Sequence, residues 1–430
     1  MSRPSLWTNF DCVDGEKTRI YFERSKSSPI KINLSLKRYE YAGRFPGHPF
    51  FQIIPHATGR LKSLFVEGAL EDVQATTSHL SHPAPLLEHL SIRCYEDALR
   101  LNSTPTIFAG DLSSLRKLYL SRVRTELPWR NMVNLTSFTL TCNPRGAVSV
   151  GQFLDFFEST PYLEEINLSF TTPTTGAQNG RLVSLACLKS MNIKDSVPSS
   201  VLLDHLLIPV GAKLEVWVDL PGSLIWKDPP KSLDNLKNFS DFTTIELRPR
   251  GFYQGMKFSG PNGQFNMIIG ASRDNVVNLM LQSLGEFDTS KTKRFEIDGG
   301  GLMPRELLHR ALLPMKDLHT LTLFKCSVPQ VFISALQPTA GSSETMVCPN
   351  LEELVLVLRD DKDMSHITPG FIQMAAARAS RGEKPRTIRI VRGEVKADPD
   401  VSKLRGHGWN VEYDPGVGLH APASLIYYSA

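Results

Sequence analysis

Clustered histidines are the first feature of the sequence that could do chemistry. His79, His82 and His89 fall within 11 residues, and imidazole nitrogens are common zinc ligands. His79 and His82 stand in a proline-rich stretch and His89 on a predicted strand, without a cysteine or carboxylate at ligand spacing. We therefore expect no metal and no other cofactor.

A basic run near the C-terminus is the second candidate. It contains Arg378, Arg381, Lys384, Arg386, Arg389, Arg392 and Lys396. Such runs bind single-stranded nucleic acid when aromatic side chains among them can stack on bases, and this run lacks those aromatics. A solvated edge between a helix and a strand is the favoured interpretation, and we expect no nucleic-acid binding.

Catalytic motifs are missing from the sequence. None of G-x-S-x-G, G-x-x-x-x-G-K-[ST], H-E-x-x-H and G-x-G-x-x-G occurs. The net charge of +4, from 48 basic and 44 acidic residues, is spread along the chain and requires neither nucleic acid nor an anionic membrane. The sequence therefore predicts a protein that is not an enzyme.

A six-residue pattern, seen clearly as LRKLYL at residues 115–120, organises most of the chain. Its order of apolar, two variable, apolar, one variable and apolar residues predicts a short strand with alternating faces. Regular copies begin at Leu61, Leu87, Leu115, Leu135, Leu163, Leu188, Phe242, Leu318 and Leu351, and looser copies span 213–218, 292–297 and 386–390. The first six starts differ by 26, 28, 20, 28 and 25 residues, a spacing typical of leucine-rich repeats.

The spacing predicts the architecture. A strand, a turn and a return leg fill one period, so each strand lies parallel beside the previous one. We predict an α/β fold, an irregular leucine-rich-repeat solenoid with a concave parallel β-sheet and helices or short turns on the convex side. Helical return legs are expected at 151–160, 200–207, 275–284 and 369–379, where apolar residues recur at helical spacing.

The ends of the chain and one insert depart from the repeat. Residues 1–58 are expected to form an N-terminal cap, with a helix at 14–25, a strand from Ile30 and a loop at 43–55. Residues 59–430 are expected to form the repeat domain, ending in a C-terminal cap. Within it, an Asn-Gly pair between apolar runs predicts a β-hairpin insert near 252–270, from Lys257 to Ile268.

One column of strand residues could bind a partner. The residue between the last two apolar positions of each strand is expected to point out of the concave face. These residues are Phe65, Ser91, Tyr119, Thr139, Asn167, Asn192, Trp217, Glu246, Glu296, Thr322, Val355 and Arg389. Aromatic side chains supply much of the binding energy at protein interfaces. The partner-binding candidates are Phe65, Tyr119, Asn167, Trp217 and Glu246, and the alternative is that neighbouring loops cover the aromatic side chains.

The expected compartment is the cytoplasm or the nucleus. The six cysteines are far apart, without a C-x-x-C pair, which favours a reducing environment over a disulfide framework. The N-terminus has no apolar signal-peptide segment, and no run of about 18 apolar residues could span a membrane. We expect a monomer that does not associate with membranes.

Several stretches resemble the leucine-rich-repeat region of the F-box-like proteins of mushroom-forming fungi. They are Leu6-Trp7-Thr8, YFERSKSSPI at 21–30, IFAG at 107–110, LPW at 127–129, NLT at 134–136 and TPYLEE at 160–165. In that family the F-box would lie upstream of Leu6, and only five residues precede Leu6, so this chain is expected to lack it.

The resemblance implies a function in ubiquitin ligation. It makes the chain the substrate-recognition part of a ubiquitin-ligase receptor, which binds a protein substrate on the concave face. A ligase adaptor would bind only if an F-box exists upstream. The alternative is a stand-alone leucine-rich-repeat scaffold or inhibitor without a link to a ligase.

Overall fold

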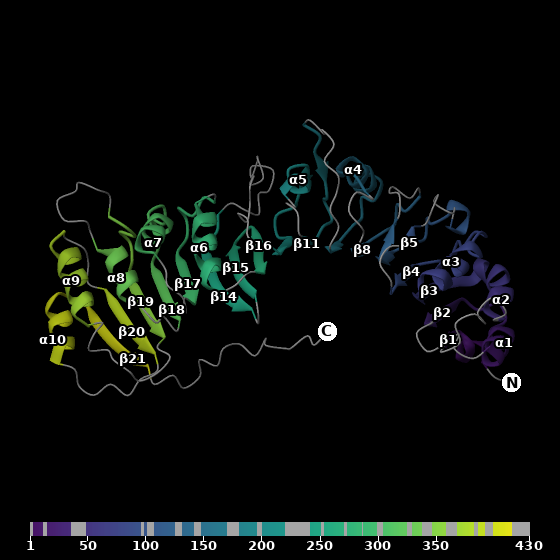
Figure 1. The fold of residues 1–430 in the computed structure, drawn as a ribbon, viewed down its shortest axis with the longest axis horizontal. Coiled ribbons are helices and arrows are strands. Elements are labelled where there is room, and N and C mark those ends of the chain that lie inside the picture. Colours follow the sequence, from purple (N-terminus) through teal and green to yellow (C-terminus); the bar gives the residue numbers. More distant parts are fainter. Residues whose placement is uncertain are drawn as a thin grey trace. The chain divides into compact units, whose positions relative to one another are not determined.

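The computed structural model shows an α/β protein with large, mostly parallel β-sheet structure (Figure 1). It describes residues 3–11, 15–35, 49–95, 99–100, 107–124, 131–141, 148–169, 180–195, 200–219, 241–250, 253–270, 273–285, 287–298, 304–324, 329–337, 346–357, 368–381, 386–391 and 399–414. The chain forms two compact units. The first unit comprises Met1–Val216 and Pro230–Leu236, and the second comprises Trp217–Pro229 and Lys237–Ala430.

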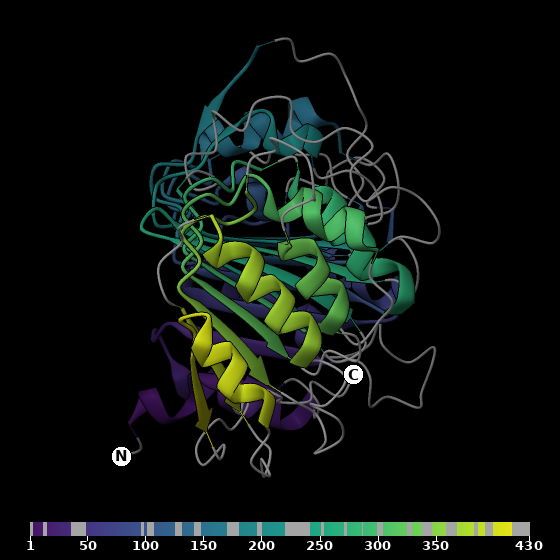
Figure 2. The same ribbon diagram turned by 90° about the vertical axis from the view of Figure 1, so that its left-hand side faces the viewer.

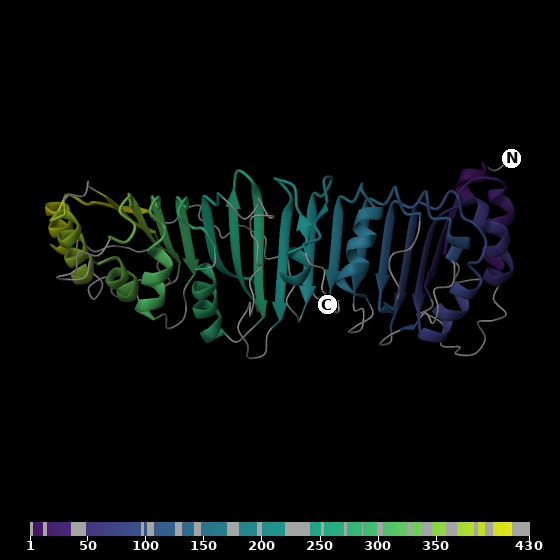
Figure 3. The same ribbon diagram turned by 90° about the horizontal axis from the view of Figure 1, so that it is seen from above.

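The first unit is built on parallel strands that follow one another in chain order (Figure 3). They are β1 (Asn9–Asp11), β2 (Ile30–Ser35), β3 (Leu61–Gly68), β4 (His89–Cys94), β6 (Lys117–Ser121), β8 (Ser137–Thr141), β9 (Glu165–Ser169) and β11 (Ser190–Asp195), with β13 (Lys213–Asp219) beginning after them. Each of the predicted strand positions from Leu61 to Leu188 carries a strand, so these predictions are confirmed.

The return legs of the first unit are varied. They contain the helices α1 (Gly15–Ser25), α2 (Pro49–Ala57), α3 (Leu70–Ser78), α4 (Val150–Ser159) and α5 (Ser200–Leu203), and the 3-10 turns η1 (Pro4–Trp7), η4 (Thr58–Arg60) and η5 (Ile107–Gly110). Two small parallel pairs complete them, namely β5 (Leu99–Arg100) with β7 (Val123–Arg124), and β10 (Val183–Ser184) with β12 (Leu206–Leu207). Helix α4 was predicted, whereas α5 covers only half of the helix predicted at 200–207.

A recurring turn explains why the first leucine of each pattern is needed. The amide of Leu115 donates to the carbonyl of Leu112 at 3.0 Å, and Leu135 donates to Met132 at 3.0 Å in the same way. All four of these side chains are buried. Each strand is therefore preceded by a tight turn whose two ends are both anchored in the core, which fixes where the strand begins.

The N-terminal cap contains a helix that the sequence analysis missed. Residues 43–55 were expected to be a loop because of their prolines, but α2 begins at Pro49, and Phe50 and Ile54 are fully buried. This part of the prediction was wrong because proline is well tolerated in the first turn of a helix, where its missing N–H has no partner to lose.

The second unit has a more regular plan (Figure 2). Its strands are β14 (Thr244–Arg250), β15 (Tyr253–Gly260), β16 (Gly263–Gly270), β17 (Arg294–Asp298), β18 (Thr320–Phe324), β19 (Glu353–Val357), β20 (Thr387–Val391) and β21 (Asn410–Asp414). Its helices α6 (Arg273–Leu284), α7 (Arg305–Leu312), α8 (Pro329–Leu336), α9 (Thr368–Ala379) and α10 (Pro399–Gly406) stack side by side over one face of the sheet. Strand β14 pairs in parallel with β17, and β17 to β21 continue in parallel, whereas β15 pairs antiparallel with both β14 and β16.

The predicted hairpin is present and longer than expected. Strands β15 and β16 pair antiparallel, from the pair Gln254 and Ile269 to the pair Gly260 and Gly263. Pro261 and Asn262 are the two turn residues. A Cβ atom on Gly260 would lie 2.5 Å from the carbonyl oxygen of Asp241, so the hairpin can pass this backbone only because the residue is glycine.

The spacing between strands explains the difference in return legs. From the start of β6 to the start of β8 there are 20 residues, whereas from β18 to β19 there are 33. A helix rises only 1.5 Å per residue, so the longer spacing accommodates α8 and the shorter one does not leave room for a helix beside its strand. Residues 415–430 of the predicted C-terminal cap lie outside the described residues.

Candidate functional site

The polar face of the first unit's sheet brings the predicted column of residues into one row. Strand pairing aligns Asn33, Phe65, Ser91, Tyr119, Thr139, Asn167 and Asn192, which we call the central row. Residues on either side of each member, such as Leu118 and Leu120 beside Tyr119, are buried in the core. The central row therefore faces away from the core, as the alternation of the strands requires.

Two aromatic side chains interrupt this polar row. Phe65 and Tyr119 lie on β3 and β6 and flank Ser91 on the strand between them. Both aromatic side chains are half-buried. Asn167 lies two strands beyond Tyr119 and is also half-buried. Three of the five predicted partner-binding residues thus share one row of one unit.

A second row on the same face is basic at its N-terminal end. This row, two residues earlier in each strand, contains Lys31, Ser63, His89, Lys117, Ser137, Glu165 and Ser190, and we call it the first row. Lys31 and Lys117 are exposed, and within the described part of the chain neither forms an ion pair. His89 is half-buried between them.

The surroundings of His89 disfavour its protonation. Partial burial lowers the pKa of His89 below 6.5, and the charge of the neighbouring Lys117 lowers it further. Lys31 and Lys62 act in the same direction, whereas Glu88 opposes them. Glu88 is already paired with Lys62, 3.1 Å from Oε1 to Nζ, so its charge is largely balanced. The local field at His89 is therefore positive.

The third row, two residues beyond the central row, is largely neutralised within the protein. Glu67 accepts a hydrogen bond from the Ser35 hydroxyl at 2.7 Å, and its Oε2 lies 3.9 Å from Nη1 of Arg93. Burial and a hydrogen bond to Glu67 raise the pKa of Tyr95 well above its ordinary value. The cations of the third row, Arg93 and Lys194, thus interact within the protein, whereas Lys31 and Lys117 of the first row form no ion pair among the described residues.

Trp217 lies on β13, where the register differs slightly from expectation. The amide of Lys213 donates to the carbonyl of Lys189 at 2.8 Å, and Leu214 and Val216 are buried. This pairing places Glu215, rather than Trp217, next to Asn192 at the end of the central row. Trp217 follows two residues later and is half-buried.

Glu246 belongs to an ion-pair ladder on the polar face of the second unit. Its Oε1 lies 3.1 Å from Nζ of Lys257, and its Oε2 lies 3.6 Å from Nε of Arg248. Arg248 also pairs with Glu296, whose Oε1 is 2.6 Å from Nε of Arg294. We call Lys257, Glu246, Arg248, Glu296 and Arg294 the charge ladder.

The middle of the second unit's column is not exposed. Glu296 is 4% exposed and Thr322 is 3% exposed, which contradicts the prediction that both point freely out of the sheet. Part of the reason is the long Arg248 side chain, whose guanidinium carbon lies 4.5 Å above the ring centre of Phe324 and next to Glu296. Arginine stems commonly cover neighbouring groups in this way.

Two arginines of the C-terminal basic run have structural roles. Arg378 is 1% exposed, and its guanidinium donates to the carbonyls of Val347 at 3.1 Å and Cys348 at 2.7 Å. Arg386 is 9% exposed and donates to the carbonyl of Pro349 at 2.9 Å. The predicted solvated edge is therefore wrong for these two residues, although Arg381 is exposed. Lys384, Arg392 and Lys396 lie outside the described residues.

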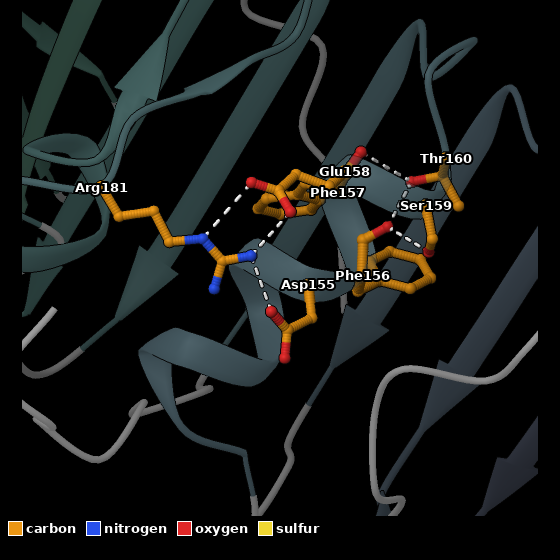
Figure 4. A network of polar contacts seen from close by, with 7 residues as sticks. All are labelled: Asp155, Phe156, Phe157, Glu158, Ser159, Thr160 and Arg181. Atoms are coloured by element: carbon orange, nitrogen blue, oxygen red, sulfur yellow. Dashed lines mark hydrogen bonds and ion pairs between the residues drawn. The ribbon is translucent and has the colours of Figure 1, made fainter.

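The other clusters of titratable groups have structural roles. Arg181 Nη2 lies 2.7 Å from both Asp155 Oδ1 and Glu158 Oε2, which ties helix α4 to the segment that leads into β10 (Figure 4). Nδ1 of His79 lies 2.8 Å from the carbonyl of Ala75 at the end of α3. Among the residues that the structure describes, no group of three or more His, Cys, Asp or Glu side chains could hold a metal ion.

The first row was not recognised from the sequence as a candidate site, although its signal was present. From Ser63 onward its members occupy the third position of the six-residue pattern, as Lys117 does in LRKLYL and His89 does in LEHLSI. Lys31 lies on the strand of the N-terminal cap, outside the copies of the pattern, and only the pairing of β2 with β3 adds it to the row.

Comparison with known proteins does not assign the chain to a family. No protein-family model matches it, and no match was found among curated proteins. Within the described residues, none of the helices has the length and apolar character needed to cross a bilayer.

Proposed function

We propose that the chain is a non-catalytic protein-binding module, a leucine-rich-repeat solenoid that recognises its partner on the polar sheet face of the first unit. The observation that carries the proposal is the central row, which holds the two half-buried aromatic side chains of Phe65 and Tyr119 in register among short polar residues. Aromatic anchors surrounded by polar groups are typical of protein interfaces.

The finer part of the proposal is a role in ubiquitin ligation. The resemblance of several stretches to F-box-like proteins of fungi supports the substrate-recognition part of a ubiquitin-ligase receptor. A sheet face that binds a protein would serve that role, because such a receptor needs a surface for its substrate.

The test is affinity purification of the tagged full-length chain, with identification of the proteins that accompany it. We expect at least one partner whose recovery is reduced by Phe65→Ala and by Tyr119→Ala. Tyr162→Ala is the matched control, because Tyr162 is 56% exposed in the turn before β9 and does not lie in the central row. A partner set that is the same for all three variants, with the proteins still folded, would contradict the proposal.

The same purification tests the ligase role separately. Recovery of a cullin and its adaptor would support a receptor for a ubiquitin ligase. A stable partner that depends on Tyr119, recovered without these components, would leave protein binding in place and contradict the ligase role.

A further inference from the structure

The first row carries two positive charges that no described residue neutralises through an ion pair. Lys31 and Lys117 are exposed, and no carboxylate of the described residues forms an ion pair with either of them. Other lysines of the same unit are paired, such as Lys62 with Glu88 at 3.1 Å and Lys189 with Glu164 at 2.7 Å. Lys31 and Lys117 differ from these two in that they lie within the row of the sheet face next to Phe65 and Tyr119.

The charge of this row also acts on His89. His89 and Lys117 are direct neighbours in the register of β4 and β6, and the charge of Lys117 helps to lower the pKa of His89, which favours the neutral imidazole. Lys31 and Lys117 belong to the same row, with Ser63 and His89 between them, and neither ammonium group has an ion-pair partner among the described residues. Two exposed cations in one sheet row favour an anionic group of a partner.

Aromatic side chains lie next to this charge. Phe65 and Tyr119 belong to the central row, one pleat from the first row, which is about 6.6 Å along the strand. Ser91 lies between the two aromatic residues on β4, two residues after His89. The face therefore presents cations and, one pleat away, two rings separated by a short side chain.

We propose that Lys31, His89, Lys117, Phe65 and Tyr119, here called the basic-aromatic patch, bind an extended acidic segment of a protein partner. In such a segment, residues i and i+2 face the same side and are also about 6.6 Å apart. An aspartate or glutamate at i faces the first row, and an apolar side chain at i+2 packs against the two rings. This inference rests on the proposed protein-binding function and adds the chemistry of the partner.

Charge on the rest of the face favours a peptide over a nucleic acid. Single-stranded nucleic acid is bound by a positive groove that follows the phosphate backbone. Here the first row continues from Lys117 through Ser137 to the exposed Glu165, and Glu67 neutralises much of Arg93 in the third row. The exposed carboxylate of Glu165 in the same row would repel a chain of phosphates that followed it.

The test is binding of a fluorescein-labelled peptide, Asp-Glu-Ser-Leu-Ser, to the full-length chain, measured by fluorescence anisotropy. We expect the Lys31→Gln, Lys117→Gln double variant to bind it about tenfold more weakly, and Tyr119→Ala about fivefold more weakly. Lys189→Gln removes one exposed lysine from the same unit, away from the patch, and is expected to bind within about twofold of the parent chain. Added salt should weaken binding.

Controls on the probe separate charge from apolar contact. A peptide with Asn-Gln in place of Asp-Glu should lose the dependence on the two lysines, and one with serine in place of leucine should lose the dependence on Tyr119. Thermal unfolding of each variant checks that the fold is retained.

Three results would overturn the inference. The first is that the acidic peptide does not bind. The second is that the Lys31→Gln, Lys117→Gln variant binds it as tightly as the parent chain does. The third is that a labelled single-stranded DNA binds more tightly than the peptide through the same residues. If a partner captured by the full-length chain depends on Tyr119 but not on the lysines, the proposed function stands and the acidic-segment inference fails. If captured partners depend on neither Phe65 nor Tyr119, the proposed function itself fails.

Discussion

In the first unit, Lys31 and Lys117 face solvent in a sheet row where the described residues provide no anion for them. In the second unit, the three cations of the charge ladder are paired, and Glu296 at its centre is buried between two arginines. Both faces are built from residues at equivalent positions of parallel strands. The charged side chains of the charge ladder pair with one another, whereas Lys31 and Lys117 of the first unit remain able to pair with a partner.

This difference separates residues that support the fold from residues that could bind. A buried carboxylate needs its partners, because an uncompensated charge away from water costs several kcal/mol. An exposed lysine keeps its water and costs the fold almost nothing when it is removed. Stability measurements on matched variants of the two units can therefore test the comparison without knowledge of any partner.

Among substitutions of charged residues, the largest effect is expected for Arg378→Met in the second unit. The variant leaves the buried carbonyls of Val347 and Cys348 without their charged donor, which should lower the free energy of unfolding by about 3 kcal/mol. The measurement is urea-induced unfolding, with hydrogen exchange in α8 and α9 to localise the effect.

Arg381→Met is the control for this variant. Arg381 follows Arg378 by one helical turn and is exposed, so its replacement should change the free energy of unfolding by less than about 0.5 kcal/mol. Equal losses of stability in the two variants would show that the guanidinium of Arg378 does not stabilise the buried carbonyls. That result would contradict the view that the second unit uses its cations to support the fold.

The second effect concerns the charge ladder. Arg248→Met removes one of the two arginines that pair with Glu296 and uncovers Phe324, and we expect a loss of about 2 kcal/mol, reduced because Arg248 is partly exposed. Lys117→Met in the first unit should cost less than about 0.5 kcal/mol, because Lys117 is exposed and forms no ion pair among the described residues. Both values come from urea-induced unfolding, and a larger loss for Lys117→Met would contradict the distinction between the faces.

Much of the fold was accessible from the sequence because it depends on local patterns. Leucines at fixed positions and alternation around Tyr119 predicted the strands, and an apolar stripe ending before Pro161 predicted α4. The Asn-Gly pair predicted the hairpin, although the turn itself consists of Pro261 and Asn262. In each case the residues that determine the element lie within it.

What could not be predicted depends on residues far apart in the chain. In the sequence, Arg378 has the pattern of a solvated cation. In the structure its guanidinium is buried against the carbonyl of Cys348, which lies 30 residues earlier in the chain. Glu296 looks exposed until Arg248, 48 residues away, covers it. That Lys31 has no ion-pair partner among the described residues is likewise a property of neighbouring strands together and not of the strand that carries the lysine.

The third effect tests whether the aromatic side chains of the central row are part of the core. Tyr119→Ala should cost about 1 kcal/mol or less in the free energy of unfolding, because its ring is only half-buried. Phe138→Ala, on the adjacent strand but fully buried, should cost about 3–5 kcal/mol. Similar losses for both variants in urea-induced unfolding would mean that Tyr119 serves the fold, which would remove the main argument for an interface.

The smallest effect is a pH dependence that originates at His89. Because the pKa of His89 is lower in the folded chain than its ordinary value of 6.5, the unfolded chain binds a proton that the folded chain does not. The stability contribution is complete above pH 6.5 and decreases as the pH falls below it. Lys117→Gln should raise the pKa of His89, measured by NMR titration of the imidazole, and reduce this decrease.

Lys189→Gln provides the reference for that titration, because Lys189 is not among the charges that act on His89. Those charges are Lys117, Lys31 and Lys62, which lower the pKa of His89, and Glu88, which raises it. An acidic peptide bound to the basic-aromatic patch should raise the pKa of His89 in the parent chain, because it supplies the anion that this row lacks. If the pKa stays unchanged in Lys117→Gln, the side chains of β4 and β6 do not interact, and the first row is a set of independent solvated groups instead of a single positive site.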